Sequence, residues 1–565
     1  MDTDHSDPAA SLPMHSNPLS YVERGAALRR MAAEGVDILV VGGGITGAGV
    51  ALDAAARGYR VGLVEKGDFA GGTSSKSTRL VHGGIRYLPQ FDFDLVREAL
   101  VERGLLMRNA PFLVRPISFV LPMYASDRRP LSIPFSMPWG LGLRYILRLG
   151  LSLYDLMAGR LGIRRHRHIG AQQALRMARC LRSEGLKDAF LYYDARTDDT
   201  RLTLTVLRTA ASRGAMLANY AEMVGSRRRN GRIAAARVRD HVTDEILDIR
   251  VGTMINAGGV FAGRIEALAK DPVEDAGHEH LRIRPAKGVH IVVSRDKLKL
   301  GDAAVVLPET DDGRILFLVP SGPHVIVGTT DTVGGDIDRP EASPDDIAYL
   351  LRHVNKYVVP RLQASDVIAT WAGYRPLIQI KEGVVSSSRL SRTHIVREGP
   401  GGMVTVTGGK LTTYRRMAQD ALDFAAKQRG DRRSHPTERL PLAGTQGWRR
   451  AKELLSAYEK DGLLNADTVQ RLGAYGSEAA VILGYIASDV GLAERIVPEL
   501  PYVMAEVVYA CRHEMALTLR DVLERRLHIA TETQDGGRSV AEAVARVMAR
   551  ELGWDEGEFL SISVP

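Results

Sequence analysis

The chain has 565 residues, of which 45% are hydrophobic and 25% charged, a composition that excludes a largely disordered protein and allows two or three domains. The formal net charge of +8 allows nucleic acid, an anionic membrane surface or an anionic small molecule as a partner. Cys180 and Cys511 stand far apart, which excludes a disulfide framework and a structural zinc motif and fits a reducing cytoplasm.

Residues 1–20 lack an apolar segment and are predicted to form a disordered tail rather than a secretory signal. A buried strand at 37–41 is followed by a glycine-rich turn, an alanine-rich helix at 48–57 and a strand at 60–64 that ends in Glu65. This order predicts a dinucleotide site, with the glycines close to a pyrophosphate and Glu65 on the ribose hydroxyls. The predicted turn residues are Gly42, Gly44, Ile45, Thr46 and Gly47.

The next segment, residues 71–87, favours FAD over NAD. Its hydroxyls and backbone amides at 72–78, which include Thr73, Ser74 and Ser75, are placed to cradle a second part of the cofactor. The run His82-Gly83-Gly84 lets the backbone approach a flat ring. The alternative reading of this segment is a solvated glycine- and serine-rich loop.

Residues 188–256 show a strand at 189–193, a helix at 199–213, a strand at 215–220, a hairpin turn at Asn230-Gly231 and a strand at 246–255. The last strand runs into Gly258-Gly259, which is either a cofactor contact or an ordinary β-turn. Apolar runs at 289–293, 303–307, 314–319 and 324–328 predict a second, largely antiparallel sheet. One helix is predicted to interrupt it, starting at Ser343-Pro344-Asp345-Asp346 with an N-cap, a proline and first-turn acids. We expect this sheet to end at residues 371–376, because Pro376 stops pairing and leaves Arg375 at the end of a strand.

A strand at 403–407 leads into Gly408-Gly409-Lys410 and a helix at 411–428. A cation in the first turn of a helix is electrostatically unfavourable, and Lys410 therefore predicts an anion held beside it. After about residue 430 the pattern changes to amphipathic helices, including 477–487, 500–511, 516–528 and 538–552. These helices predict a separate all-α domain at 431–565.

The predicted fold class is therefore α/β. A Rossmann-type, doubly wound FAD-binding domain is interleaved with an antiparallel-sheet substrate domain across residues 21–430, and the substrate sheet lies mainly within 287–400. A C-terminal all-α domain completes the chain.

Several motifs together resemble the FAD-dependent, quinone-linked glycerol-3-phosphate dehydrogenases. They are the segments 42–47, 73–75, 82–87, 287–290, 328–331, 373–377, 408–415, 471–479 and 514–526. The chain departs from that pattern at Asn256–Phe261, where the family usually continues Gly-Pro-Trp or Gly-Val-Trp, and at Thr407, where phenylalanine is common. The resemblance implies oxidation of sn-glycerol 3-phosphate to dihydroxyacetone phosphate by hydride transfer from C2 to FAD, with electrons passed to a membrane quinone.

The resemblance also implies the roles of individual residues. Arg86, Tyr87, Thr330, Arg375, Arg389 and Lys410 are expected to bind the substrate, and His290, Arg375 and Lys410 to take part in catalysis. His290 is the candidate proton acceptor, with a pocket cation, a water molecule or a purely structural histidine as alternatives. The expected cofactor contacts are Gly42, Gly44, Ile45, Thr46, Gly47, Glu65, Thr73, Ser74, Ser75, His82, Gly83, Gly84, Met223, Gly258, Gly409, Leu411 and Thr412.

The segment 139–157 has an amphipathic helical pattern and is followed by a basic run at 160–168. It is either a helix packed on the core with one solvent-exposed polar face or a helix that lies on an anionic membrane surface. The resemblance favours the second reading and a cytoplasmic protein bound peripherally to the inner face of the cell membrane; a homodimer is allowed. Histidines cluster at 164–168 and at His278 and His280. No metal is expected at them, because interleaved arginines repel a divalent cation and flavin chemistry needs none.

The sequence is also compatible with two other functions. One is an oxidase that passes electrons to oxygen and releases hydrogen peroxide. The more remote one is a nucleic-acid-binding protein with structural FAD, which the 6% aromatic content disfavours because stacking platforms are then scarce. No nucleic acid is therefore expected as a partner.

Overall fold

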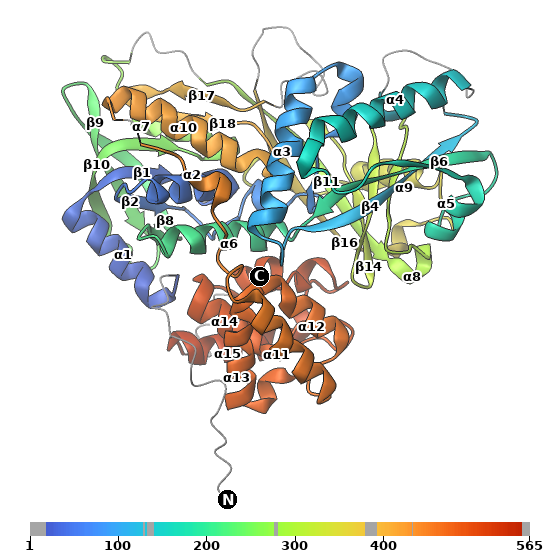
Figure 1. Ribbon diagram of the computed structural model, residues 1–565. Helices are drawn as coiled ribbons and strands as arrows, with labels where there is room; N and C mark the ends of the chain where they lie inside the picture. Colours follow the sequence, from blue (N-terminus) through green and yellow to red (C-terminus); the bar gives the residue numbers. More distant parts are fainter. Residues whose placement is uncertain are drawn as a thin grey trace, which may run out of the picture.

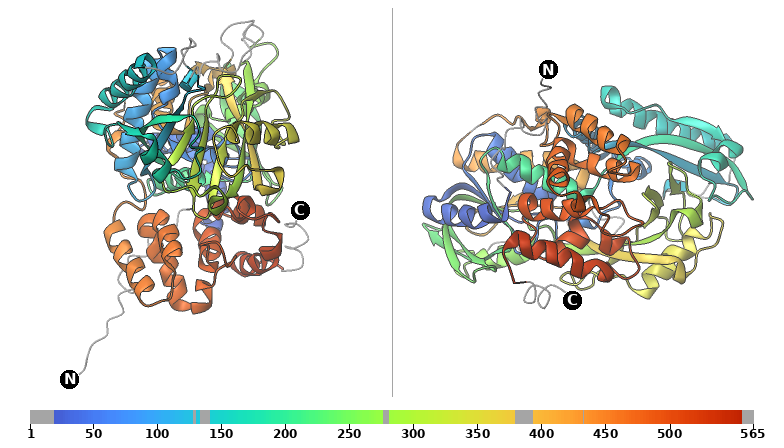
Figure 2. Two further views of the ribbon diagram at one scale, coloured as in Figure 1. Left: turned by 90° about the vertical axis from the view of Figure 1, so that its right-hand side faces the viewer. Right: turned by 90° about the horizontal axis from the view of Figure 1, so that it is seen from below.

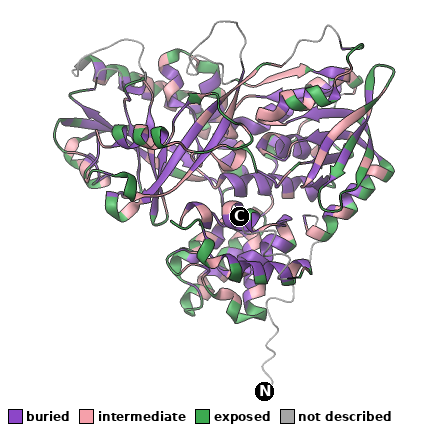
Figure 3. Ribbon diagram, turned by 180° about the vertical axis from the view of Figure 1, so that it is seen from behind, coloured by how far each residue is buried: buried purple, intermediate pink, exposed green. Residues whose placement is uncertain are grey.

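The computed structural model describes residues 19–127, 130–132, 141–275, 281–378, 393–431 and 433–555. A wide α/β body carries the two sheets, and a bundle of helices from the C-terminal part of the chain packs below it (Figure 1; Figure 2). The strands at the centre of the body are buried, whereas the outer faces of the surrounding helices are exposed (Figure 3).

The first sheet contains the predicted nucleotide-binding strands. Its parallel strands follow the order β18-β10-β1-β2-β7, with β17 antiparallel at the β18 edge and the β8–β9 hairpin extending from β10. The strands are β1 (Val36–Val41), β2 (Val61–Val64), β7 (Met216–Ala218), β8 (Ala221–Arg229), β9 (Arg232–Asp240), β10 (Ile246–Asn256), β17 (Ile395–Glu398) and β18 (Val404–Thr407). Strands covered on both faces are expected to be continuously apolar, and this holds for β2 and for β1 beyond Asp37.

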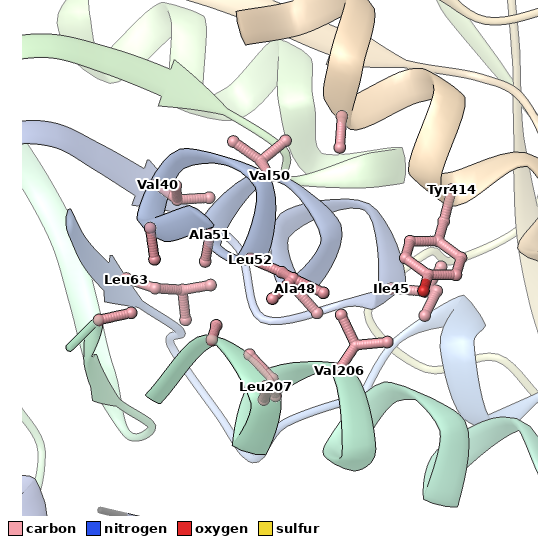
Figure 4. Packing of buried hydrophobic residues seen from close by; sticks show 14 of the residues in the cluster. Val40, Ile45, Ala48, Val50, Ala51, Leu52, Leu63, Val206, Leu207 and Tyr414 are labelled. Carbon is pink, nitrogen blue, oxygen red and sulfur yellow. The ribbon is translucent and has the colours of Figure 1, made fainter. Parts of the chain in front are cut away.

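Helices α2 (Ile45–Ala56), α6 (Asp199–Ala211) and α10 (Tyr414–Arg429) pack together over this sheet. Figure 4 shows Val40 and Leu63 from the strands against the small residues of α2, with Val206 and Leu207 of α6 below and Tyr414 of α10 beside them. Small side chains on α2 let the neighbouring helix approach closely: a Cβ at Gly49 would lie 2.6 Å from the Tyr414 ring.

The second sheet follows the order β15-β11-β14-β13-β12-β4-β6-β3, with β16 beside β11 and β5 beside β6. It is antiparallel except for the β12–β4 pair, which confirms the predicted largely antiparallel sheet. Its strands are β3 (Leu80–Val81), β4 (Arg115–Tyr124), β5 (Arg167–Gly170), β6 (Leu186–Arg196), β11 (Ile283–Ser294), β12 (Ala304–Leu307), β13 (Leu316–Ser321), β14 (His324–Gly328), β15 (Thr332–Val333) and β16 (Val367–Ile378).

Both faces of this second sheet are covered by helices. Residues such as Phe119 and Leu121 of β4 face the cluster that includes α3 (Phe93–Asn109) and α4 (Leu141–Ala158). Val120 faces the opposite cluster, with α5 (Ala171–Met177), α8 (Arg295–Leu298) and α9 (Pro344–Val354). The alternation follows from the two-residue period of a strand. Helix α9 begins with a capping box between Ser343 and Asp346, as its sequence indicates.

The predicted end of the sheet near Pro376 is wrong. Strand β16 continues to Ile378, with Pro376 opposite Pro285 of β11. Among the described residues β16 pairs with β11 alone, and an edge strand tolerates proline because the missing N–H would have faced away from the ladder. Arg375 therefore lies inside a strand, which fixes the direction of its side chain.

The C-terminal helices are α11 (Trp448–Lys460), α12 (Ala466–Leu472), α13 (Ala479–Ser488), α14 (Met504–Glu514) and α15 (Ala541–Leu552), with a π-helical turn at Asp521–Arg526. The predicted helix at 516–528 is therefore wrong over its first turn. Asp521 explains this, because its carboxylate accepts the N–H groups of Leu517 and Thr518 at 2.8 and 3.0 Å and holds them in a turn.

Buried ion pairs join this bundle to the α/β body. Asp68, in the loop after β2, accepts hydrogen bonds from Arg525 and Arg526, and Arg201 of α6 pairs with Glu514. These partners are at most 7% exposed, so separating the bundle from the body would leave uncompensated buried charges.

Two further helices complete the described body: α1 (Tyr21–Glu34), which the sequence reading did not predict, and α7 (Ala262–Ala269). Residues 1–18 of the predicted tail lie outside the described residues. Within the described ranges, the helices are all too short or too polar to cross a membrane.

Candidate active site

A cavity of about 1520 Å³ lies where the carboxyl ends of the first sheet meet the second sheet and the C-terminal bundle. Its walls come from the turn after β1, the loop after β2, strands β8, β11 and β16, the segment 408–412 and residues 518–531 of the bundle. Ligands of open α/β sheets bind at this edge, which agrees with the predicted nucleotide site.

The glycine-rich turn after β1 brings bare backbone to the cavity. Gly42 has φ +116°, and a Cβ there would lie 2.6 Å from the carbonyl oxygen of Ala257. A Cβ at Gly47 would lie 1.8 Å from the carbonyl oxygen of Gly42, so helix α2 packs directly on the turn. The N–H of Ile45 at the start of α2 donates to Ser74 Oγ at 2.8 Å. Such a turn fits a pyrophosphate, which needs close backbone and a helix N-terminus.

Glu65 lies at the end of β2 with both carboxylate oxygens held. Oε2 accepts the N–H of Gly43 at 2.6 Å, and Oε1 accepts the N–H of Gly67 at 3.0 Å. Burial raises the pKa of Glu65, while these two N–H groups oppose the increase. The side chain is thus fixed beside the glycine turn, where a ribose would lie.

The two departures noted in the sequence lie on this side of the cavity. The ring of Phe261 lines the cavity and faces Lys66, whose Nζ is 3.8 Å from the ring centroid. Thr407 is buried, and its hydroxyl donates to the carbonyl of Gly259 at 3.2 Å. Phe261 is in ring contact with Lys66, and Thr407 is buried and hydrogen-bonded. Neither departure therefore leaves a gap in the protein around the cavity.

Lys410 does not occupy the first turn of a helix, and this part of the prediction is wrong. It precedes a short 3₁₀ turn at Leu411–Thr413, and α10 begins only at Tyr414. Its Nζ lies 4.1 Å from the ring centroid of Tyr87. A cation–π contact therefore accommodates the charge, in addition to any anion in the cavity. Arg86 contacts the same tyrosine and donates to its hydroxyl at 3.2 Å.

Arg375 projects from β16 into the cavity with its guanidinium held in place. Nη1 donates to the carbonyl of Thr330 at 3.1 Å and to Asp331 at 3.2 Å, and Nη2 donates to Thr329 Oγ1 at 3.0 Å. The group lies across Gly288 of β11, where a Cβ would be only 2.5 Å from Nη2. The side chain is about a quarter exposed, so a charged group within the cavity can reach it.

His290 of β11 is 2% exposed and lines the cavity. Its Nε2 is 2.8 Å from Thr78 Oγ1, and its ring stacks on Trp371 with 5.1 Å between centroids. Among the described residues, its Nδ1 has no hydrogen-bond partner. Burial, and then the charges of Arg375 and Arg79, lower the pKa of His290 to about 3. The imidazole is therefore neutral at physiological pH.

Most predicted site residues line this one cavity. They are Gly42, Gly44, Ile45, Thr46, Glu65, Thr73, Ser74, His82, Met223, Gly258, Gly409, Leu411 and Thr412 of the cofactor set, and Tyr87, His290, Arg375 and Lys410 of the substrate and catalytic set. Gly47, Ser75, Gly83, Gly84, Arg86 and Thr330 are not among its lining residues. Arg389 lies outside the described residues, and its role stays a prediction.

Some residues that do not line the cavity hold the lining residues in place. Thr330 Oγ1 accepts the N–H of Val289 at 2.9 Å, while its carbonyl accepts from Arg375. Phe317, Trp371 and Glu524 were not predicted, although all three line the cavity. Thr78 and Lys76, which fall within the predicted cofactor range 72–78, also line it, and Lys76 forms an ion pair with Glu524. Trp371 carried a signal, because it lies four residues before Arg375 and thus on the same face of the strand. Glu524 carried none, since it comes from the C-terminal bundle.

The histidines near residue 166 have carboxylate partners: His166 with Asp155 at 2.7 Å and His168 with Asp188 at 2.9 Å. The pair His278 and His280 lies outside the described residues. Across the described ranges, no group of three potential ligands is arranged to hold a metal ion.

The fold and the cavity define a class. A parallel sheet with a glycine-rich turn and an acidic residue after the neighbouring strand, joined to an antiparallel sheet that closes over the same cavity, is the arrangement of a FAD-dependent oxidoreductase. The sequence agrees: residues 37–415 match the family described as FAD dependent oxidoreductase, and residues 435–558 match the C-terminal domain of alpha-glycerophosphate oxidase. The cofactor is FAD.

Individual relatives narrow the class. Glycerol-3-phosphate dehydrogenase 2 of Mycobacterium tuberculosis is 38% identical over 544 residues, which cover 95% of this chain and 88% of the relative. The mitochondrial glycerol-3-phosphate dehydrogenase of Arabidopsis thaliana is 33% identical, covering 97% and 87%. The structure of glycerol-3-phosphate dehydrogenase from Bacillus halodurans complexed with FAD is 30% identical, with a TM-score of 0.75 over 96% of each chain. The chain belongs to the FAD-dependent glycerol-3-phosphate dehydrogenases.

A more distant solved structure shows the fold alone. L-alpha-glycerophosphate oxidase from Mycoplasma pneumoniae is 17% identical, with a TM-score of 0.53 over 68% of this chain and 94% of the oxidase.

Proposed function

We propose that this protein oxidises sn-glycerol 3-phosphate to dihydroxyacetone phosphate and passes the electrons to a membrane quinone. The observation that carries the proposal is the convergence of Arg375, Lys410 and His290 on the cavity that also holds the glycine-rich turn. When bound, FAD supplies the acceptor for the hydride that leaves C2 of the substrate.

Two of the cations that line the cavity, Arg375 and Lys410, bind the anionic substrate. Arg375 presents a planar guanidinium already oriented by Thr329, Thr330 and Asp331, which suits contact with phosphate or hydroxyl oxygens. Lys410 adds a point charge beside Tyr87. Because both side chains are held before the substrate arrives, binding orders fewer groups and the reacting carbon is oriented.

His290 takes the hydroxyl proton in this proposal. Its low pKa keeps the ring neutral and able to accept a proton, but also makes the protonated form unfavourable. The charges of Arg375 and Arg79 contribute to that low pKa, and a dianionic phosphate bound near Arg375 opposes them. Substrate binding therefore raises the proton affinity of the imidazole when the proton has to be moved.

Helix α4 supports a peripheral membrane location at the cytoplasmic face. Leu143, Leu147 and Leu151 form its core face, whereas Leu149 and Leu156 are 71% and 76% exposed. The exposed arginines at 148, 160, 164, 165 and 167 lie on the same helix or follow it. Helix α4 lies at the end of the molecule away from the C-terminal bundle (Figure 1). Exposed leucines beside arginines suit an anionic lipid surface, where a quinone is accessible.

A vesicle experiment tests this location. The double variant Leu149→Asp/Leu156→Asp is expected to lose co-sedimentation with vesicles of anionic phospholipid while retaining activity with a soluble dye. Val490→Asp is the control, because Val490 is 65% exposed on the C-terminal bundle. If the double variant sediments as well as the control, α4 is not the membrane contact.

The alternative electron acceptor is oxygen. The purified protein with glycerol 3-phosphate should reduce a short-chain quinone anaerobically and form little hydrogen peroxide in air. Stoichiometric peroxide with no quinone reduction would identify an oxidase. We do not propose the nucleic-acid alternative, because the chain matches an enzyme family over nearly its whole length.

A further inference from the structure

A buried carboxylate lies behind the loop His82–Gly84. Asp194, on β6, is 1% exposed. Its Oδ1 accepts the N–H of Gly83 at 3.1 Å and a hydrogen bond from Arg103 Nη1 at 2.5 Å, and its carboxylate oxygens accept the hydroxyl of Tyr154 at 2.8 and 2.9 Å. One carboxylate thus joins α3, α4 and the loop, through three donors.

The loop is held from its opposite side as well. Thr412 Oγ1, on the cavity side, accepts the N–H of His82 at 3.3 Å. Gly83 also packs tightly at the back: a Cβ there would lie 2.4 Å from the hydroxyl of Tyr154 and from Leu100. The backbone of residues 82–84 is therefore fixed between a wall of the cavity and a buried anion.

This loop lies next to the residues that we expect to bind the substrate. Gly84 has φ +75°, and its carbonyl accepts the N–H of Tyr87 at 2.9 Å. A Cβ at Gly84 would be 3.6 Å from Lys410 Nζ. A displacement of the loop would consequently move Tyr87 and change the surroundings of Lys410.

Stability alone gives little reason for a charge in this place. Burying an arginine and an aspartate costs desolvation that their attraction only partly offsets, and apolar pairs of similar volume are often as stable. Burial accordingly raises the pKa of Asp194, against the influence of Arg103. The N–H of Gly83, by contrast, needs an acceptor wherever the loop is buried.

We propose that Asp194 is a positioning residue of the active site, whose carboxylate holds the backbone of residues 82–84 against the cofactor cavity. The consequence for turnover rests on the proposed oxidation of glycerol 3-phosphate. The consequence for the bound flavin does not, because it concerns the cavity wall alone.

Two double variants separate the acceptor from the charge. Arg103→Met/Asp194→Leu replaces the ion pair by apolar groups and leaves the N–H of Gly83 without its acceptor. Arg103→Met/Asp194→Asn removes the same charges but keeps an oxygen for Gly83 and Tyr154. For both FAD-loaded variants and the wild type, we would measure the visible spectrum and the midpoint potential by anaerobic dithionite titration, and kcat and KM with glycerol 3-phosphate.

We expect the leucine variant to show a shifted flavin spectrum and midpoint potential and a kcat about tenfold to a hundredfold lower, because small misplacements of this kind cost about that much. The asparagine variant should stay within about threefold of the wild type in kcat, with an unshifted potential. Equal behaviour of the two variants would overturn the proposal.

If the leucine variant does not fold, Tyr154→Phe tests the proposal instead. This variant removes one hydrogen-bond donor that orients the Asp194 carboxylate but keeps the aromatic ring. A shifted flavin spectrum with a threefold or greater loss of kcat supports the role, and values identical to the wild type refute it. Failure of glycerol 3-phosphate to reduce the wild type would count against the proposed function, while the dithionite comparison would still test Asp194.

Discussion

The guanidinium of Arg375 lies directly against Gly288, and this close contact provides a sharp test of the proposed substrate site. Gly288 is not among the residues with positive φ, so the backbone itself allows alanine. A Cβ at this position would nevertheless lie 2.5 Å from Nη2 and 2.8 Å from Cζ of Arg375. Real Cβ contacts are essentially never that close, so the guanidinium has to move.

The size of the effect follows from the contacts that move with it. The hydrogen bonds from Arg375 to Thr329, Thr330 and Asp331, all between 3.0 and 3.2 Å, set the direction of the guanidinium. A hydrogen bond to a charged group contributes about 1.5–3 kcal/mol. Losing one such contact with the substrate should therefore lower kcat/KM by roughly tenfold to 150-fold.

The assay is steady-state reduction of a dye by Gly288→Ala with glycerol 3-phosphate. The control is Gly225→Ala on β8, where the nearest atom to a new Cβ is 3.8 Å away. In an Arg375→Lys background, Gly288→Ala should have little further effect, because the planar group that it displaces is gone. Wild-type kcat/KM in Gly288→Ala, or an undiminished effect in the lysine background, would refute the reasoning.

Three further changes have defined outcomes. Lys410→Ala should raise the KM for glycerol 3-phosphate at least tenfold and should retain FAD. The control Lys427→Ala, at an exposed site late in α10, should leave the KM unchanged. Loss of FAD from Lys410→Ala would make Lys410 a structural residue. His290 has a pKa lowered from 6.5 to about 3, so its contribution to stability is complete above pH 6.5 and declines as the pH falls towards 3. Between pH 7.5 and pH 5, denaturant unfolding should show the wild type losing about 2 kcal/mol more than His290→Gln, and parallel curves would contradict the burial of a neutral ring. Gly47→Ala should be purified without FAD, whereas Gly150→Ala, with nothing within 4 Å of its Cβ, should be yellow; a yellow Gly47→Ala protein would show that the turn can relax.

The nucleotide-binding half was accessible from the sequence because its determinants are local. Gly42, Gly47 and Glu65 lie within one strand–turn–helix–strand unit, whose backbone geometry the glycines themselves impose. The same holds for α9, whose capping residues lie within four positions of each other.

The substrate half depended on contacts between distant segments. Pro376 lies in a strand that has a single neighbour among the described residues, and the sequence does not say which strands are at an edge. The ring that stabilises Lys410 belongs to Tyr87, more than three hundred positions earlier in the chain. Trp371 was recognisable by its spacing from Arg375, whereas Glu524 reaches the cavity only because buried ion pairs fix the C-terminal bundle there.

The oxidation of glycerol 3-phosphate is tested most directly by anaerobic reduction of the bound flavin. We predict that glycerol 3-phosphate bleaches the yellow absorbance of the purified protein. Glycerol without a phosphate should do so far more slowly, because Arg375 and Lys410 then lack the anion that they bind. Unchanged absorbance with saturating glycerol 3-phosphate, in protein that dithionite still reduces, would contradict the proposed function.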